Sequence, residues 1–227
     1  MPSAQHVKIE ETPGRLPTGD LELLLGEIHA SPIRYLDSVH GRGKVLYAEG
    51  EAARGVYILR SGRAAVSISS NQGRVVILRT AQAGDVLGLN SVLRGSAYDT
   101  TVKTLEPCRT DFVPRAELMA LMATSHAGTQ AILNILSHEL FELTARTSAM
   151  VLAQTANARL AKLLLEWGRQ SGRIDRIFTH EEMAQMICSS RETVTRLLAT
   201  LNRQSIIHIA SDSILISDRI ALERMVE

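Results

Sequence analysis

The chain has 227 residues, of which 45% are hydrophobic and 22% are charged, and its formal net charge at pH 7 is +1. This is the balance of an ordinary globular protein, long enough for one large or two modest domains. A near-neutral net charge excludes a globally basic nucleic-acid binder, so any contact with DNA must rest on locally placed charge.

The cysteine content and the hydropathy of the chain limit the cellular compartment and the kinds of metal or disulfide site that can be expected. Cys108 and Cys188 are the two cysteines, far apart in sequence, and they support neither a disulfide framework nor a four-thiolate metal site. The first twenty residues are polar, contain three prolines and lack the apolar core of a signal peptide. No stretch approaches the roughly 20 apolar residues of a membrane span. We therefore expect a cytoplasmic protein without membrane contact and without a bound metal.

The pattern of apolar, polar and glycine residues changes three times along the chain and divides it into four segments. Residues 1–20 are expected to form a flexible arm, and residues 21–124 a β-rich domain that opens with a short helix. Residues 125–156 are expected to form a long helix, and residues 157–227 a second, smaller domain.

The β-rich domain alternates short apolar runs with glycines. The runs are Val45–Tyr47, Val56–Leu59, Ala64–Ile68, Val75–Leu78, Val86–Leu87, Thr101–Thr104 and Thr110–Val113. Glycines between them, such as Gly62 and Gly84, suit turns that require positive φ. Short strands at this spacing predict an antiparallel sandwich or jelly-roll barrel.

The long helix is predicted by a segment, residues 126–155, without proline and without glycine after Gly128. Two stripes run along it at spacings of three and four: Leu133, Leu136, Leu140, Leu143, Thr147 and Met150 in one, and Phe141, Thr144, Ser148 and Val151 in the other. Two stripes require two covering surfaces, of which one is the protein's own barrel and the other a partner helix. We therefore expect a homodimer, with packing of both stripes inside one chain as the alternative. The expected interface residues are Leu133, Leu136, Leu140, Phe141, Thr144, Ser148 and Val151.

A helix-turn-helix is predicted after an amphipathic helix at residues 157–168. Thr179 and Glu182 form a capping box that starts its first helix, and the turn falls at Cys188. Ser189 or Ser190 caps the second helix. Its expected inward face is Val194, Leu197, Leu198 and Leu201. Two apolar runs, residues 206–209 and 214–216, predict a small β-wing behind it.

The outward face of the second helix carries chemistry suited to a DNA major groove. This face consists of Arg191, Glu192, Thr195, Arg196 and Arg203. Arginine donates two parallel hydrogen bonds to guanine, and a carboxylate accepts from the cytosine amino group. The alternative is that Glu192 and Arg196, four residues apart, simply pair on a solvated helix, or that Glu192 completes a capping box with Ser189.

The stretch Ser190–Arg196 resembles the recognition-helix motif of the CRP/FNR family of bacterial transcription regulators, and Gly84–Gly88 resembles the turn before that family's phosphate-binding cassette. The resemblance implies an α+β fold with an N-terminal β-roll or jelly roll of the cyclic-nucleotide-binding type, a long dimerisation helix and a C-terminal winged helix-turn-helix. It also implies a homodimer on a near-palindromic operator of double-stranded DNA.

The resemblance assigns roles to individual residues of the helix-turn-helix. Arg191, Glu192 and Arg196 match the residues that read a TGTGA-type half-site. The other positions expected at the DNA are Ser190, Thr193, Thr195, Thr179 and His180, of which the last two match backbone-contacting positions. RNA polymerase is a further possible partner, although the segment between Trp167 and Thr179, where the family contacts it, is short here.

The effector cassette departs from the family pattern. Cyclic-AMP binders carry a glutamate and an arginine where this chain has Leu89 and Asp99. A cyclic phosphate facing Asp99 would be repelled, so we do not expect cAMP as the effector. The candidate pocket residues are Gly88, Leu89, Asn90, Asp99, Thr100 and Thr144. Other effectors stay open: a small apolar or aromatic molecule, a nitrogen oxide bound through haem, another nucleotide, or none.

Two other classes of function fit the sequence less well. The first alternative is a nucleotide- or haem-binding signalling module that regulates a protein partner, against which the altered cassette and the winged domain count. An enzyme is not expected, because the sequence has no phosphate loop of the GxxxxGK type, no metal-ligand pair at useful spacing and no nucleophile elbow.

Overall fold

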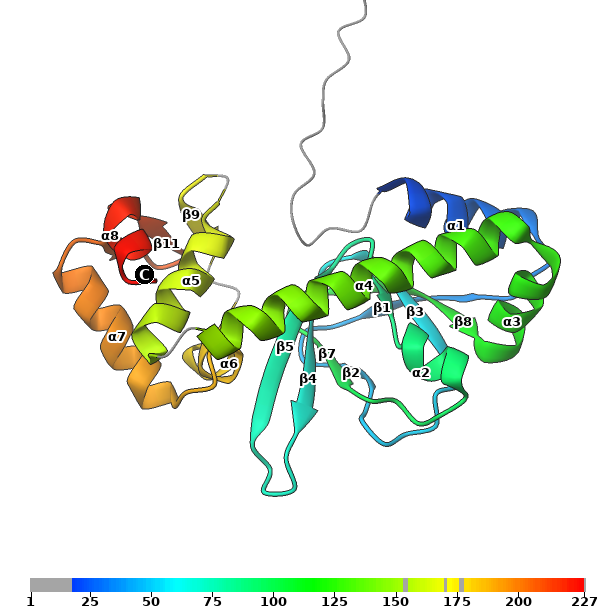
Figure 1. Cartoon of the computed structure of the whole chain (residues 1–227), viewed down its shortest axis with the longest axis horizontal. Coiled ribbons are helices and arrows are strands. Elements are labelled where there is room, and N and C mark those ends of the chain that lie inside the picture. The colour runs from blue at the N-terminus through cyan, green and yellow to red at the C-terminus, as the bar shows by residue number, and fades with distance from the viewer. Residues whose placement is uncertain (1–17, 153–154, 170, 176–177, 227) are drawn as a thin grey trace, which may run out of the picture.

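A computed structural model describes residues 18–152, 155–169, 171–175 and 178–226. Nothing is described for the side chains of residue 18, residue 142 and residues 144–152. Two lobes lie at either end of the long helix α4, which spans His126–Leu152 (Figure 1). None of the described helices is long and apolar enough to cross a membrane.

The N-terminal lobe opens with helix α1, Thr18–Ala30, which packs along α4. The expected arm falls mostly outside the described residues, and its last three residues, 18–20, belong to this helix instead. Leu24 and Ile28 are buried in the lobe's core. The helix therefore starts earlier than its apolar pattern indicates, at residues that contribute little to the core.

Two four-stranded antiparallel sheets form the expected β-roll. One sheet has the order β1-β8-β3-β6, with β1 at Leu36–His40, β8 at Cys108–Pro114, β3 at Gly55–Ser61 and β6 at Val86–Leu87. The other has the order β2-β7-β4-β5, with β2 at Val45–Tyr47, β7 at Thr101–Thr104, β4 at Arg63–Ser69 and β5 at Val75–Gln82. Each expected run forms a strand, and the predicted fold class is confirmed.

Three elements of this lobe are not predicted by the pattern of apolar residues in the sequence. Strand β1 pairs with β8 over its whole length, yet its apolar residues Leu36 and Val39 are exposed, so no buried alternation marks it. Helix α2, Leu89–Arg94, is six residues long and follows Gly88, which has a φ of +80°. Helix α3, Arg115–Thr124, joins the barrel to α4.

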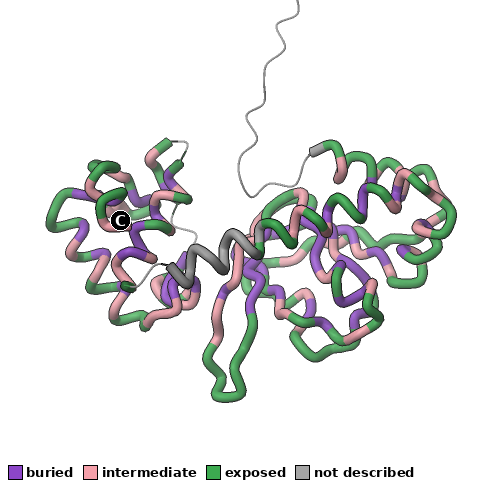
Figure 2. Tube along the Cα trace, viewed as in Figure 1, coloured by how far each residue is buried: buried purple, intermediate pink, exposed green. Residues whose placement is uncertain are grey.

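Helix α4 packs against the barrel. Most of the residues that it buries there lie outside the two predicted stripes. Ala131, Ile132 and Ile135 are fully buried against the barrel core. Leu136, expected at a dimer interface, packs partly buried against the same core. Leu133 and Phe141 remain 52% and 69% exposed. Figure 2 shows this exposed side along the first half of α4.

The C-terminal lobe is the expected winged helix-turn-helix. Its helices are α5 at Ala156–Trp167, α6 at His180–Met186, α7 at Arg191–Arg203 and α8 at Arg219–Arg224. The wing strands are β10 at Ile207–Ile209 and β11 at Ser213–Ile216, and a third strand, β9 at Arg173–Asp175, extends their sheet in the order β10-β11-β9. The predicted strand pair forms, but the third strand, β9, was not predicted. Its sequence gives little signal, because Ile174 is its only apolar residue. Helix α8 was likewise not predicted.

The two lobes share an apolar contact. Ile77 of β5 belongs to the same buried cluster as Met183 and Met186 of α6. At the end of the β4–β5 hairpin, the Arg74 side chain donates to the carbonyl of Cys188 at 3.2 Å. Strand β5 thus touches the helix-turn-helix directly.

The glycine that starts α2 yields a test of how tightly the β-roll is built there. A Cβ at Gly88 would lie 2.7 Å from Cε1 of Tyr98, whereas a Cβ at Gly50, which has a similar φ of +86°, would meet nothing within 4 Å. Alanine in this backbone region costs about 1–2 kcal/mol. We therefore expect Gly50→Ala to lower the free energy of unfolding by about that amount, and Gly88→Ala by about 1–3 kcal/mol more, because of overpacking. Urea denaturation measures both, and equal losses would contradict the tight packing at Gly88.

Candidate nucleic-acid interface and effector pocket

The first helix of the helix-turn-helix starts at the predicted capping box. The Thr179 hydroxyl accepts from the backbone amide of Glu182 at 3.1 Å, and the Glu182 carboxylate accepts from the backbone amide of Thr179 at 2.6 Å. Met183, Ala184 and Ile187 are buried, so these residues form the inward face of the helix, as predicted. The small side chain of Ala184 lies where α6 packs against α7.

The turn between the two helices is built on Cys188 in the left-handed region, with a φ of +51°. The backbone amide of Ser189 donates to the carbonyl of Ala184 at 2.9 Å, which closes the helix as in a Schellman motif. Glycine usually fills the left-handed position because it has no Cβ. Cys188 therefore holds a strained backbone position in the turn.

Ser190, not Ser189, caps the second helix. Its side chain accepts from the backbone amide of Thr193 at 3.1 Å. The third helical residue is thus Thr193, so Glu192 does not complete a capping box. Hydrogen bonds from its own backbone amide and from the Ser190 side chain hold the pKa of the Glu192 carboxyl below its usual value.

The outward face of α7 is open to solvent. Arg191, Glu192, Thr195 and Arg196 are exposed, whereas Val194, Leu198 and Leu201 on the other side are buried. No ion pair joins Glu192 to Arg196 in the part of the chain that the structure describes, so the pairing alternative is not realised there.

Thr195 is tied into the protein by its hydroxyl. It donates to the carbonyl of Arg191 at 2.9 Å and lies 2.9 Å from Nδ1 of His180. Because a hydroxyl has a single hydrogen, the ring nitrogen of His180 must be the donor in the second contact. His180 at the start of α6 is thereby fixed against the exposed face of α7.

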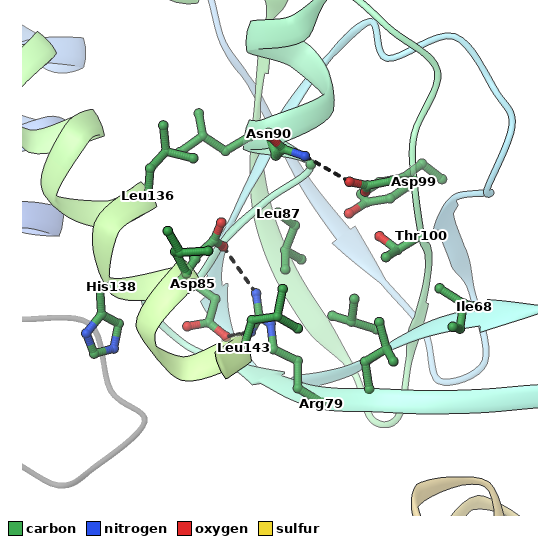
Figure 3. A pocket seen from close by; sticks show the side chains of 17 residues that line it. Ile68, Arg79, Asp85, Leu87, Asn90, Asp99, Thr100, Leu136, His138 and Leu143 are labelled. Atoms are coloured by element: carbon green, nitrogen blue, oxygen red, sulfur yellow. Dashed lines mark hydrogen bonds and ion pairs between the residues drawn. The ribbon is translucent and has the colours of Figure 1, made fainter. Parts of the chain in front are cut away.

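A cavity of about 450 Å³ lies between the β-roll and α4 (Figure 3). The predicted pocket residues Gly88, Leu89, Asn90, Asp99 and Thr100 all line it. Thr144, the sixth, lies in α4 with a side chain outside the description. Leu136, Leu140 and Leu143 of α4 form part of its wall, so two residues expected at the dimer interface also face the pocket.

The two positions that depart from the family cassette have clear structural roles. Leu89 is 1% exposed and presents no hydrogen-bonding group to the cavity. The Asp99 carboxylate accepts from the side-chain amide of Asn90 at 3.0 Å, and the Asp99 backbone amide donates to the Ser91 hydroxyl at 3.2 Å. A carboxylate is thus held at the cavity where cAMP binders carry a guanidinium.

An ion cluster that also lines the cavity was not predicted. Nη1 of Arg79 contacts the Asp85 carboxylate at 2.5 Å, and Nη2 lies 3.4 Å from the Glu139 carboxylate. Asp85 also accepts from the backbone amide of Gln82 at 3.1 Å. One sequence signal exists for it, since Arg79 is the only charged residue of strand β5 and follows four apolar residues.

Burial sets the charge behaviour of this cluster. Burial opposes ionisation of Arg79, but Asp85 and Glu139 outweigh it and raise the pKa of the guanidinium above its usual value. For Glu139, burial is the largest effect and raises the pKa to about 7, with Arg79 opposing the shift and Asp85 and Asp99 adding to it. Glu139 is therefore only partly ionised near neutral pH.

Two family models match the chain. A model of the cyclic nucleotide-binding domain matches residues 39–125, and a model of the Crp-like helix-turn-helix domain matches residues 158–225. The first match covers the β-roll from the end of β1 through α3, the second covers most of the winged helix-turn-helix, and the whole of α4 lies between them.

Relatives and solved structures agree with these matches. The CRP-like cAMP-activated global transcriptional regulator of Mycobacterium tuberculosis is 29% identical over 190 residues, covering 81% of this chain and 84% of the relative. Transcriptional regulator LdrP of Thermus thermophilus is also 29% identical over 190 residues, covering 81% and 93%. The structure of FixK2 from Bradyrhizobium japonicum has a TM-score of 0.73 at 22% identity, covering 86% of this chain and 98% of that one. A CRP-family transcriptional regulator from Thermus thermophilus has a TM-score of 0.68 at 25% identity, covering 83% and 96%.

Proposed function

Since the chain belongs to the CRP/FNR family and is a DNA-binding transcription regulator of that type, we propose that it works as a homodimer on a near-palindromic operator with TGTGA-like half-sites, without control by cAMP. The observation that carries this proposal is the exposed polar face of α7, which stands opposite a fully buried apolar face. Because its buried face fixes the backbone of the helix, binding to DNA requires little further ordering of that backbone.

Within this face, the proposal assigns base reading to Arg191, Glu192 and Arg196. All three side chains are exposed at the N-terminal half of α7, the part of a recognition helix that enters the major groove. The arginines are suited to guanine and the glutamate to the cytosine amino group. This combination is the chemistry that a TGTGA half-site and its complementary strand require.

Backbone contacts are assigned to the helix starts. Thr179, His180, Ser190 and Thr193 lie at the N-termini of α6 and α7, where backbone amides and hydroxyl groups suit phosphate oxygens. Thr195 holds His180 in place, so both residues position the reading face. Such contacts set the register of the protein on DNA without reading its sequence.

Dimerisation is supported by the exposed side of α4. Leu133 and Phe141 stand two helical turns apart and are each more than half exposed, although the opposite side of the helix is buried in the barrel. Apolar side chains at this spacing suit a second copy of the same helix related by a two-fold axis. In such a dimer, the two recognition helices would enter the major groove at two half-sites one turn of the DNA apart.

Independence from cAMP rests on the pocket chemistry. Asp99 would face the cyclic phosphate with like charge, and Leu89 provides no acceptor for the ribose hydroxyl. Arg79 does not substitute for the missing arginine, because Asp85 and Glu139 already neutralise it.

We expect Arg191→Ala and Arg196→Ala each to weaken binding to a duplex with two inverted TGTGA half-sites by about 1–3 kcal/mol per half-site, because each removes one bidentate base contact. Fluorescence anisotropy at one fixed salt concentration measures the loss. Arg219→Ala on α8, which removes an exposed arginine paired with Glu223 instead, serves as the control and should bind as the wild type does. If all three variants bound this duplex with wild-type affinity, α7 would not be the reading helix.

We expect Phe141→Lys to convert a dimer into a monomer, because two lysines would meet where two phenylalanines pack. Light scattering coupled to size-exclusion chromatography measures the mass directly. Met119→Lys, which alters a 37% exposed apolar residue on α3, is the matched control and should remain dimeric. A Phe141→Lys protein with unchanged dimer mass would place the interface elsewhere.

We expect cAMP to leave operator affinity unchanged, at concentrations up to about 1 mM, because the cyclic phosphate is repelled at Asp99. The same anisotropy assay with and without the nucleotide tests this expectation. A saturable increase in affinity at micromolar cAMP would show that the pocket accepts the phosphate despite Asp99.

A further inference from the structure

The cavity between the β-roll and α4 is acidic. Among the described residues that line it, three are carboxylates, Asp85, Asp99 and Glu139, whereas Arg79 is the single arginine or lysine. Arg79 is fully engaged by Asp85 and Glu139 at 2.5 and 3.4 Å. This described part of the lining therefore carries an excess of negative charge and offers no uncompensated arginine or lysine to an anionic ligand.

The remaining titratable groups do not reverse this balance. His138 also lines the cavity, and Figure 3 shows its ring across α4 from Asp99 and Thr100. Burial raises the pKa of the Tyr47 hydroxyl well above its usual value, so it stays neutral. The field in the cavity is thus set by the three carboxylates and Arg79.

The other described walls of the cavity are mostly apolar or aromatic, with Asn90, Thr100 and His138 as further polar residues. Apolar side chains come from both the barrel and α4: Val66, Ile68, Leu78, Leu87, Leu136, Leu140 and Leu143. Tyr47 adds an aromatic ring, stacked on Tyr98 with the ring centroids 3.9 Å apart. A volume of about 450 Å³ lies in the range of sites for small organic molecules. Apolar walls with acidic groups and a ring face suit a molecule with an apolar body and a positive charge.

We propose that this cavity binds a small organic cation with an apolar body, an alkyl or arylalkyl amine, whose ammonium group faces Glu139 and Asp99. This inference deepens the proposed function, since it names an effector class for the same regulator, and it rests on that function only for the consequence at DNA. Binding to the protein itself is independent of DNA and is tested separately.

A bound ammonium group has a measurable effect on Glu139. The pKa of its carboxyl is about 7 without a cation beside it, chiefly because of burial. A positive charge beside the carboxylate favours its ionised form and lowers this pKa, so a proton leaves Glu139 for the buffer as the amine binds. Below pH 7 the proton must first be removed, so affinity falls as the pH falls. For a single group with this pKa, affinity at pH 6 is about tenfold lower than at pH 8.

The experiment is isothermal titration calorimetry of the full-length protein with two sets of size-matched probes. One set is phenethylamine, 2-phenylethanol and 3-phenylpropanoate, and the other is hexylamine, hexanol and heptanoate. At pH 8 we expect saturable binding of at least one amine, at least tenfold tighter than its alcohol, and no binding of the carboxylates. At pH 7, where about half of the Glu139 carboxyls are protonated before binding, proton release appears as a binding enthalpy that differs between phosphate and Tris buffers. The proposal is overturned if neither amine binds below 10 mM, or if an alcohol or carboxylate binds as tightly as its matched amine.

Variants identify the group responsible. Glu139→Gln keeps the side-chain shape and should lose at least tenfold in amine affinity together with the pH dependence and the proton release. Asp99→Asn should weaken the amine but keep the pH dependence. Glu22→Gln, on the exposed face of α1, is the control and should change neither. Thermal melts verify that each variant folds, and a folded Glu139→Gln protein with unaltered affinity and pH dependence would overturn the proposal.

The anisotropy assay then separates this inference from the proposed function. Amine binding in the calorimeter supports the cation site whether or not the protein binds the TGTGA duplex. A protein that binds the duplex but neither amine keeps its proposed function and loses the cation site.

Discussion

The packing of α4 against its own β-roll is the constraint on which the rest of the structure depends. Ala131, Ile132 and Ile135 are removed from water by the barrel, which fixes the rotation of the helix. That rotation places Glu139 over the cavity and leaves Phe141 on the outer side. One apolar contact therefore determines both the roof of the pocket and the surface available to a second chain.

Strand β5 connects the pocket to the DNA-reading lobe. Leu78 and Arg79 line the cavity, whereas the neighbouring Ile77 belongs to the buried cluster of the helix-turn-helix. The register of β4 and β5 shifts at this point, so adjacent residues of β5 serve both environments. The lobes thus share a strand whose position depends on an ion cluster at one side and on apolar packing at the other.

The two functional regions differ in how far they follow the family pattern. The helix-turn-helix keeps its caps, its buried face and its exposed Arg191 and Arg196. The pocket keeps its place and its glycine turn, but its charges are reversed, with Asp99 at the cavity and Arg79 neutralised. The function proposed above therefore joins a reading helix of the family type to a pocket with a different set of charges.

The sequence by itself determined the elements whose stabilising contacts are local. The capping box at Thr179, the cap at Ser190 and the apolar periodicity of α7 join residues three or four positions apart, and glycine turns separate the strands of the roll. The tertiary structure alone decided the pairing of β1 with β8 and the addition of β9 to the wing, because exposed or very short strands leave no periodic signal. It also decided the pocket cluster: Arg79 and Glu139 are 60 residues apart, and only the packing of α4 onto the barrel brings their charges together.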